Sequence, residues 1–346
     1  TLVLATIPML TFDDYGFLQM LKQITDQRPD VVVIGYGSNA AFEEDGFEHF
    51  TKGMNRLLDS LELLGVKIVL VSPPPYESQP SLPDMTLPNE RLSKVAEWIR
   101  MTAGKRSHVY IDIFGGMRSL AREDPSAKFT DNGIHLNELG HRRLAEVVAK
   151  QLAPVNDAWR VHLTADGNVA AASATHIKNV ASTERGTRFE LRWQAKDQHL
   201  PSLYSGHKRT LRITGLMPGQ YTLDVDGFRV ATGSAGQWES GMVIASGPDF
   251  ERLEELRRAI VEKNRLFFFG FRPQNEAYIF LFRRHERGHH AGEVSQFAAL
   301  VEKQEQEIAR LRTPIERQYE LVREQDYPEH EVPLDVPPTD VEAELA

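Results

Sequence analysis

The stretch Val31-Val32-Val33-Ile34-Gly35-Tyr36-Gly37-Ser38-Asn39 decides the fold of the first part of the chain. Four consecutive apolar residues that run into glycines are typical of a short strand buried on both faces of a parallel sheet. Apolar residues at helical spacing over residues 47–64 predict a helix next, and Gly65 stands where a C-cap is expected. The stretch therefore indicates a strand followed by a helix in an open α/β sheet.

The same alternation continues to residue 152. Residues 66–71 and 109–113 predict two further strands, and residues 90–103 and 138–152 predict two further helices. Open parallel sheets bind their ligands outside the carboxyl ends of the strands. We therefore expect a site built from the segments that follow the strands, which are Gly37-Ser38-Asn39, Pro73-Pro74-Pro75 and Phe114-Gly115-Gly116.

The pattern changes after residue 155. Residues 156–246 contain segments of period two, with Asp226-Gly227 as a hairpin turn, and predict a small β-sandwich-like module. Residues 247–326 are charged and helical in pattern, whereas residues 327–346 are rich in proline and acids, as in a linker to a further domain. We therefore expect four parts, with boundaries near residues 155, 246 and 326.

Composition excludes several classes of function. The formal net charge is -9, and the Lys and Arg residues are scattered among acids, which disfavours a nucleic-acid partner. The sequence contains no cysteine, which excludes disulfides, cysteine nucleophiles and thiolate metal sites. No apolar run reaches the roughly 20 residues that a membrane-spanning helix needs, so no span is expected in this sequence.

Two segments carry candidate catalytic residues: the one that holds Gly37 and Asn39, and residues 131–141, which hold His135. A serine hydroxyl needs an imidazole to accept its proton, and the imidazole needs a partner that fixes its tautomer. His135 is the candidate base, and the amide of Asn39 is a candidate donor to an oxyanion. Each segment alone is also explained by ordinary turn chemistry, so the prediction depends on their occurring together in this order.

Together the two segments resemble those of the SGNH hydrolases, the GDSL-type esterases. The family's third block has the form Gly-x-Asn after a parallel strand, and Gly37 and Asn39 match it. Its fifth block places an acid shortly before the catalytic histidine, and His135 matches that histidine. The resemblance covers roughly residues 1–153 and implies a three-layer α/β/α, flavodoxin-like domain with a parallel sheet over residues 1–155. It also implies ester hydrolysis through an acyl-enzyme without a cofactor, with Asn39 and Gly37 in the oxyanion hole.

The sequence departs from the family pattern at three places. The acid expected three residues before the histidine is replaced by Asn132, with Asp131 one position earlier, so Asp131, Asn132 or a backbone carbonyl could orient His135. Ala40 replaces the acid that commonly follows the third-block asparagine, with Glu43 close by. The Gly-Asp-Ser nucleophile block and the second block are not visible, so we expect a fragment that lacks its first strand and nucleophile and is inactive as given.

The resemblance to planctomycete-type multidomain proteins implies an O-acetylated carbohydrate or another small ester as substrate, outside the cytoplasm. The alternative is a non-catalytic carbohydrate-binding or scaffold protein with a decayed SGNH domain. Three aromatic residues of the β module, Trp193, Trp238 and Tyr204, could stack on sugar rings, although such residues more often belong to the core. A cluster at His285, Glu286, His289 and His290 is better explained as a charged helix surface than as a metal site, so no metal is expected.

Overall fold

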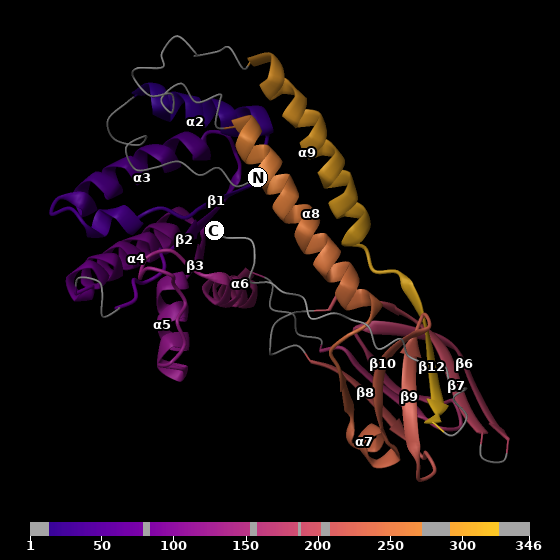
Figure 1. Ribbon diagram of the computed structural model, residues 1–346. Helices are drawn as coiled ribbons and strands as arrows, with labels where there is room; N and C mark the ends of the chain where they lie inside the picture. The colour runs from indigo at the N-terminus through magenta and orange to yellow at the C-terminus, as the bar shows by residue number, and fades with distance from the viewer. Residues whose placement is uncertain are drawn as a thin grey trace, which may run out of the picture. The chain divides into compact units, whose positions relative to one another are not determined.

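The computed structural model describes residues 14–78, 84–152, 158–185, 188–201, 208–271 and 291–324. The chain forms two compact units (Figure 1). Unit 1 is residues 1–156 with 271–294, and unit 2 is residues 157–270 with 295–346. The expected linker at residues 327–346 lies outside the described residues, as do Tyr204, His285, Glu286, His289 and His290.

Unit 1 contains a parallel sheet of three strands in the order β1 (Val31–Ile34), β2 (Lys67–Val71), β3 (Val109–Ile111). Val31 pairs with Lys67, and Val69 pairs with Val109. The strands lie where the sequence predicts them, except that the third ends at Ile111 and not at residue 113. Parallel pairing places the three carboxyl ends, and the segments that follow them, on one edge of the sheet.

Helices cover both faces of this sheet (Figure 1). Ile68 and Leu70 of β2 point into a core shared with α2, α3 and α4, whereas Val69 and Val71 point into a core shared with α5 and α6. Alternate residues of one strand thus bury apolar side chains on opposite faces. The helices are α2 (Asp14–Gln27), α3 (Gly46–Glu62), α4 (Thr86–Arg106), α5 (Ile113–Glu123) and α6 (Glu138–Leu152). The expected three-layer α/β/α domain is confirmed.

Helix α5 was not predicted, and its N-cap explains why β3 is short. The Asp112 carboxylate accepts a hydrogen bond from the Gly115 N–H at 2.9 Å, and the Ser72 hydroxyl accepts one from the Phe114 N–H at 2.9 Å. These contacts satisfy N–H groups that the first turn of a helix leaves without intrahelical partners. Ile113, which the sequence pattern assigned to a strand, therefore begins a helix.

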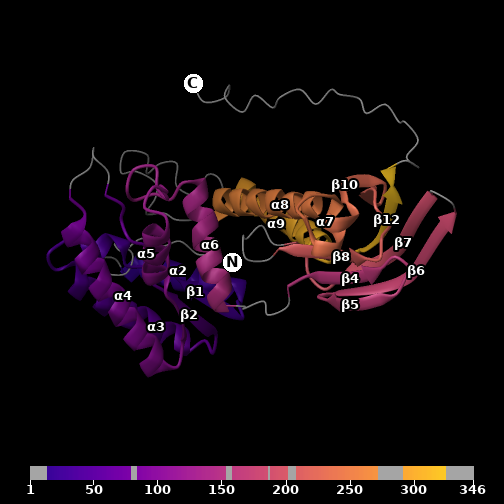
Figure 2. The same cartoon turned by 90° about the horizontal axis from the view of Figure 1, so that it is seen from below.

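Unit 2 contains two sheets that pack face to face around one core (Figure 2). One sheet has the order β10-β9-β12-β7-β6 and the other has the order β11-β8-β4-β5. The expected hairpin is present, because Asp226 and Gly227 have φ values of 51° and 82° between β9 and β10. The strands are β4 (Arg160–Thr164), β5 (Val169–Ser173), β6 (Thr175–Arg185), β7 (Arg188–Asp197), β8 (Arg209–Thr214), β9 (Gln220–Val225), β10 (Phe228–Ser234), β11 (Met242–Ile244) and β12 (Glu316–Arg323).

The core of unit 2 explains its tryptophans. Trp193 and Trp238 are 2% and 0% exposed, and Trp193 stacks on Tyr319. Side chains buried to this degree cannot present a face to a sugar ring, so they are core residues. Trp238 lies on a short helix, α7 (Ala235–Ser240), and donates to the carbonyls of Tyr221 and Gly233.

The helical region is shorter than expected, because β12 follows it. The helices are α8 (Pro248–Phe271) and α9 (Ala291–Leu311), and β12 pairs antiparallel with both β7 and β9 in the middle of the five-stranded sheet. The two helices lie side by side (Figures 1 and 2), joined by an ion pair between Lys263 and Glu305 at 3.2 Å. The expectation of a helical region up to residue 326 is corrected to end at Leu311. In the described part of the chain, no helix is long and apolar enough to cross a bilayer.

Candidate active site

The first loop of the candidate site follows β1 and carries Asn39. Gly37 has a φ of 122° and turns the chain into a 3₁₀ helix over Ser38–Ala41. Asn39 is exposed, and its side-chain amide makes no hydrogen bond to any described residue. Its Nδ2 hydrogens are therefore available to a ligand, as an oxyanion donor requires.

Glycine at position 37 is required by both the backbone and the packing. A Cβ atom there would lie 2.6 Å from Cγ1 of Val95 and 3.3 Å from the ring of Phe50. The positive φ is also a conformation that L side chains rarely adopt. The carbonyl of Gly37 accepts a hydrogen bond from the Ala40 N–H at 3.2 Å. The packing thus accounts for Gly37, and its expected part in an oxyanion hole stays a prediction.

The second loop precedes α6, and its centre is the contact between Asn132 and His135. Oδ1 of Asn132 accepts hydrogen bonds from the N–H groups of Ile134 and His135, at 3.2 and 2.9 Å. Nδ2 of Asn132 lies 2.9 Å from Nδ1 of His135. Since the atom that accepts two N–H groups must be the amide oxygen, the atom that faces the imidazole is the amide nitrogen.

This contact fixes the tautomer of His135. An amide nitrogen can only donate, so Nδ1 of the neutral ring accepts and the ring proton lies on Nε2. In a serine hydrolase the partner of Nδ1 is an acceptor, so that Nε2 is free to take the serine proton. The structure therefore holds His135 firmly, but in the tautomer that presents a donor at Nε2.

Asp131 does not occupy this position. Its backbone N–H donates to the carbonyl of His135 at 2.9 Å, while the only described side chain on the imidazole is that of Asn132. Of the ways to orient His135 that the sequence left open, the geometry supports Asn132. No serine hydroxyl among the described residues is hydrogen-bonded to His135.

Glu77 holds the histidine loop from the segment that follows β2. Its carboxylate accepts hydrogen bonds from the N–H groups of Phe129 and Thr130, at 2.7 and 3.0 Å, and from the Thr130 hydroxyl. The Glu77 N–H donates to the Gly133 carbonyl at 2.9 Å, and the Gly133 N–H donates to Oγ1 of Thr130 at 3.0 Å. One acidic side chain thus satisfies the polar backbone of a tight loop, which fixes the place of His135.

Tyr76, the residue before Glu77, holds the first loop. Its hydroxyl donates to the Ser38 carbonyl at 2.7 Å, and its ring stacks on Phe42. Burial raises the pKa of Tyr76 to about 12, so the hydroxyl stays protonated and remains a donor. Ala41 and Ile134, from the two loops, pack into one apolar cluster with Tyr76. The segment Tyr76–Glu77 therefore brings the loops of Asn39 and His135 to the same end of the sheet.

A pocket of about 550 Å³ adjoins the histidine loop. Glu77, Thr130 and Leu136 form part of its wall, so it lies next to His135 in the chain although His135 does not line it. Its other polar lining includes Asn89, Arg118 and Lys128. The pocket can accommodate a polar group near the candidate site.

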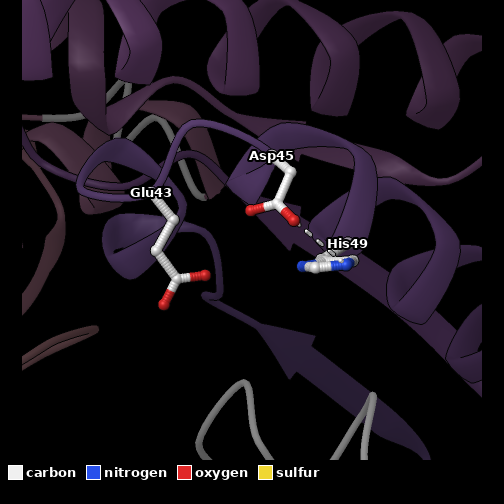
Figure 3. A group of neighbouring side chains, drawn as sticks. All are labelled: Glu43, Asp45 and His49. Atoms are coloured by element: carbon white, nitrogen blue, oxygen red, sulfur yellow. Dashed lines mark ion pairs between the residues drawn. The ribbon is translucent and has the colours of Figure 1, made fainter.

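Three side chains beyond the first loop lie close enough together to share an ion (Figure 3). Glu43, Asp45 and His49 each offer a ligand atom within 4.8 Å of the others, and His49 lies 3.5 Å from Asp45. Both acids are exposed, and apart from proximity no feature of these side chains indicates a bound ion. We assign no metal to them.

Sequence reasoning missed Tyr76, Glu77 and Thr130. Residues 73–75 were recognised only as the end of a strand, and nothing local to Glu77 shows that it contacts Thr130, 53 positions later. The only signal in the sequence is an acid shortly after a Pro-rich turn, and this signal does not indicate which residue the acid contacts. The contact arises from the parallel pairing of the strands.

The fold and the loops define a class of protein: a doubly wound α/β domain with a histidine and an asparagine at the carboxyl edge of its sheet. Residues 5–143 match the model of the GDSL-like Lipase/Acylhydrolase family. This match covers the N-terminal part of the chain and supports a hydrolase that acts on ester bonds.

Solved structures similar to this chain include one with a TM-score above 0.5, which supports the fold. A gut microbial diltiazem-metabolizing enzyme is similar in structure to this chain, with a TM-score of 0.64 and 15% sequence identity. The similar region covers 92% of this chain and 88% of that enzyme. For a catalytic mutant of an acetylxylan esterase from Geobacillus stearothermophilus, the similar region covers 43% of this chain and 68% of the esterase. The TM-score is 0.36 and the sequence identity is 15%. A GDSL-family protein from Veillonella parvula covers 44% of this chain and 76% of its own, with a TM-score of 0.35 and 12% identity. No curated protein matches the chain significantly.

Proposed function

We propose that this chain carries the base and an oxyanion donor of a serine ester hydrolase. His135 takes the proton of a serine hydroxyl as it attacks the ester carbonyl, and the Asn39 amide donates to the developing oxyanion. His135 then returns the proton to the departing alcohol, and a water molecule activated in the same way releases the acid. The observation that carries this proposal is the convergence of both loops on Tyr76–Glu77.

The proposal places the nucleophile outside the described residues, since no described serine contacts His135. The test is the protein encoded by the coding sequence extended upstream of Thr1, assayed on p-nitrophenyl acetate. His135→Ala should lower kcat by about 10³-fold or more, as removal of a catalytic base does elsewhere. His141→Ala, an exposed histidine one turn into α6, is the matched control and should keep its activity. Equal activity in both variants would refute the proposal.

The proposed substrate is a small acyl ester of a carbohydrate, such as an O-acetylated sugar, met outside the cytoplasm. Hydroxyl, amide and cationic side chains in the pocket wall, among them Thr86, Asn89 and Lys128, suit a ligand rich in hydroxyl groups. Acetylated oligosaccharides should therefore have a higher kcat/KM than p-nitrophenyl esters of long-chain acids. The reverse preference would point to a lipid ester and would contradict this substrate class.

One observation favours a second candidate function, a non-catalytic binding protein. The amide of Asn132 keeps the proton of His135 on Nε2, and in serine proteases a comparable exchange of the orienting acid for an amide costs about 10⁴-fold in kcat. A binding protein would tolerate this tautomer. It would bind acetylated oligosaccharides, as measured by calorimetry, without hydrolysing them and without loss of affinity on His135→Ala.

A further inference from the structure

Asn132 is the only asparagine in the sequence that is followed by a glycine. The backbone nitrogen of the following residue can attack an asparagine side-chain amide and form a five-membered ring, and a glycine there offers the least steric hindrance. Asn132 is exposed to water, whereas Gly133 is buried with a φ of 80°. Of the asparagines in this sequence, Asn132 is therefore the one whose following residue hinders such a reaction least.

The oxygen of the Asn132 amide is already held by two donors. Oδ1 accepts from the N–H groups of Ile134 and His135, at 3.2 and 2.9 Å. Attack on Cγ moves negative charge onto this oxygen, and paired backbone N–H groups are the donors that stabilise such a charge in acyl-transfer sites. The loop thus polarises the amide toward attack.

The nitrogen of the same amide faces an acid–base group. Nδ2 lies 2.9 Å from Nδ1 of His135, the atom from which a protonated imidazole can give a proton to departing ammonia. An amide nitrogen is a poor leaving group until it is protonated. After the attack Nδ2 is an amine with a lone pair, and a protonated Nδ1 at this distance can then donate a proton to it.

The attacking nitrogen, that of Gly133, has a hydrogen-bonded acceptor for its proton. The Gly133 N–H donates to Oγ1 of Thr130 at 3.0 Å, and the Thr130 hydroxyl donates in turn to the carboxylate of Glu77. A proton can therefore pass from Gly133 through Thr130 to Glu77 as the new bond forms.

We propose that Asn132 is a self-modifying site, at which the protein converts its own amide to a carboxylate. The Gly133 nitrogen bonds to Cγ, the Cγ–Nδ2 bond breaks, and ammonia leaves with a proton from His135. Water then opens the ring: cleavage of the Cγ–N bond gives aspartate and restores the peptide, and cleavage on the other side gives isoaspartate. The net change consumes one water and releases one ammonia, without an oxidant or reductant.

The carboxylate changes what His135 can do. An aspartate three residues before the histidine accepts a hydrogen bond from Nδ1–H, so the ring proton leaves Nε2 and that nitrogen becomes a base. Conversion of Asn132 therefore regulates the site, by supplying the acceptor that the amide withholds. This consequence for catalysis rests on the proposed function, whereas the conversion itself does not.

Mass spectrometry of the whole protein tests the conversion. The folded protein is incubated at neutral pH in water labelled with oxygen-18 and is then digested with trypsin in ordinary water. The peptide of residues 129–142 is fragmented to distinguish Asn132 from Asn137. The oxygen label separates conversion during incubation from conversion during digestion. We expect labelled aspartate and isoaspartate to accumulate at position 132 several-fold faster in the folded protein than in urea, while the exposed Asn39 and Asn179 stay unchanged. A rate at Asn132 no higher than at Asn39, or no higher than in urea, overturns the proposal.

Variants of the proton path supply a second test. Thr130→Val and Glu77→Gln should each slow the conversion several-fold, because the Gly133 N–H loses its outlet. Glu90→Gln changes an exposed acid of the same pocket wall and should leave the rate unaltered. Thermal melts identify a variant that does not fold. If either Thr130→Val or Glu77→Gln fails to fold, the conversion rate of the other variant tests the mechanism. Path variants that are folded and convert at the original rate contradict the mechanism.

The catalytic consequence has its own readout. In the upstream-extended protein, Asn132→Asp should raise kcat/KM by about 10²- to 10⁴-fold over freshly prepared protein. Two-bond proton–nitrogen NMR spectra should show the ring proton of His135 move from Nε2 to Nδ1. Conversion without any ester hydrolysis by Asn132→Asp would sink the proposed function and leave the modification site standing. If Asn132→Asp hydrolyses esters but Asn132 does not convert, the proposed function stands and the modification site is refuted.

Discussion

Asn39 and His135 differ in how the structure holds them. The imidazole of His135 contacts the Asn132 amide, and its loop is hydrogen-bonded to Glu77. The Asn39 amide, in contrast, is exposed and makes no hydrogen bond to a described residue. A donor that has no other partner costs little to redirect toward a transition state. Its removal should therefore affect the chemical step and leave the fold intact.

Asn39→Ala tests this difference. We expect kcat of the upstream-extended protein to fall by about 10²- to 10³-fold with little change in KM, since the contact forms with the oxyanion and not with the ground state. The thermal melting temperature should hardly change. Asn179→Ala, an exposed asparagine of β6, is the control for activity alone, because its amide donates to Gln194 at 2.6 Å and its φ is 54°. A rise in KM at constant kcat would show that Asn39 binds substrate and does not stabilise the oxyanion.

Tyr76 is held in its neutral form, and this predicts alkaline sensitivity. Its pKa rises from 10.0 to about 12 on burial, so below pH 10 both the folded and the unfolded chain carry the phenol, and above pH 10 the unfolded chain ionises first. The free energy of unfolding should therefore fall as pH rises from 10 to 12.

Urea unfolding of Tyr76→Phe checks this account. Below pH 10 the variant should lose about 1 kcal/mol with the hydrogen bond to Ser38, and above pH 10 its stability should fall less steeply than that of the unchanged protein. Tyr110 is half-buried, and burial also raises its pKa to about 12, so it keeps part of the slope. Equal slopes in both proteins would contradict a buried, neutral Tyr76.

At the scale of elements, β12 is the segment that departs furthest from its sequence neighbourhood. It follows the long charged helix α9, yet it pairs with β7 and β9 through Tyr319 and Leu321. Leu321 is fully buried, while Gln318 is exposed on the opposite face. Leu321 thus pairs with Leu191 and Leu223, which lie 130 and 98 positions earlier in the chain.

Leu321→Ala should therefore destabilise unit 2 by about 2 to 5 kcal/mol, the usual cost of a cavity at a fully buried leucine. Gln318→Ala, three residues earlier on the exposed face, should change stability by less than about 0.5 kcal/mol. Chemical unfolding followed by tryptophan fluorescence measures both. Similar, small effects would mean that β12 is not part of the core.

At the scale of the whole molecule, the apolar cores belong to separate stretches of sequence. The clusters of unit 1 draw on residues 17–147, and the cluster of unit 2 draws on residues 159–321. A unit that has its own core and its own hydrogen-bonded sheets can fold alone.

Residues 158–324, which hold the core of unit 2 together with residues 271–294 of unit 1, should fold when expressed without residues 1–157. We expect near-ultraviolet circular dichroism from the buried Trp193 and Trp238 and a single cooperative thermal transition, because both sheets of the sandwich lie within this range. A chain without near-ultraviolet signal and without a cooperative transition would show that unit 2 depends on residues 1–157.

The sequence by itself determined the features that local pattern controls. A continuous apolar run followed by glycines is enough for β1, helical spacing for α3 and α6, and Asp226-Gly227 for the hairpin of β9 and β10. Asn39 and His135 were also recognisable as candidates, because each lies directly beside an element with a strong pattern. These features depend on interactions within a few residues, which a sequence displays directly.

Only the tertiary structure decided the rest. The distance along the chain does not tell whether Asp131 or Asn132 reaches the imidazole, because one backbone rotation exchanges the two, and hydrogen bonds from Ile134 and His135 select Asn132. The contact of Glu77 with Thr130 and the place of β12 depend on which distant segments share a sheet edge. Pairings of this kind follow from the packing of the whole unit, so no local period records them.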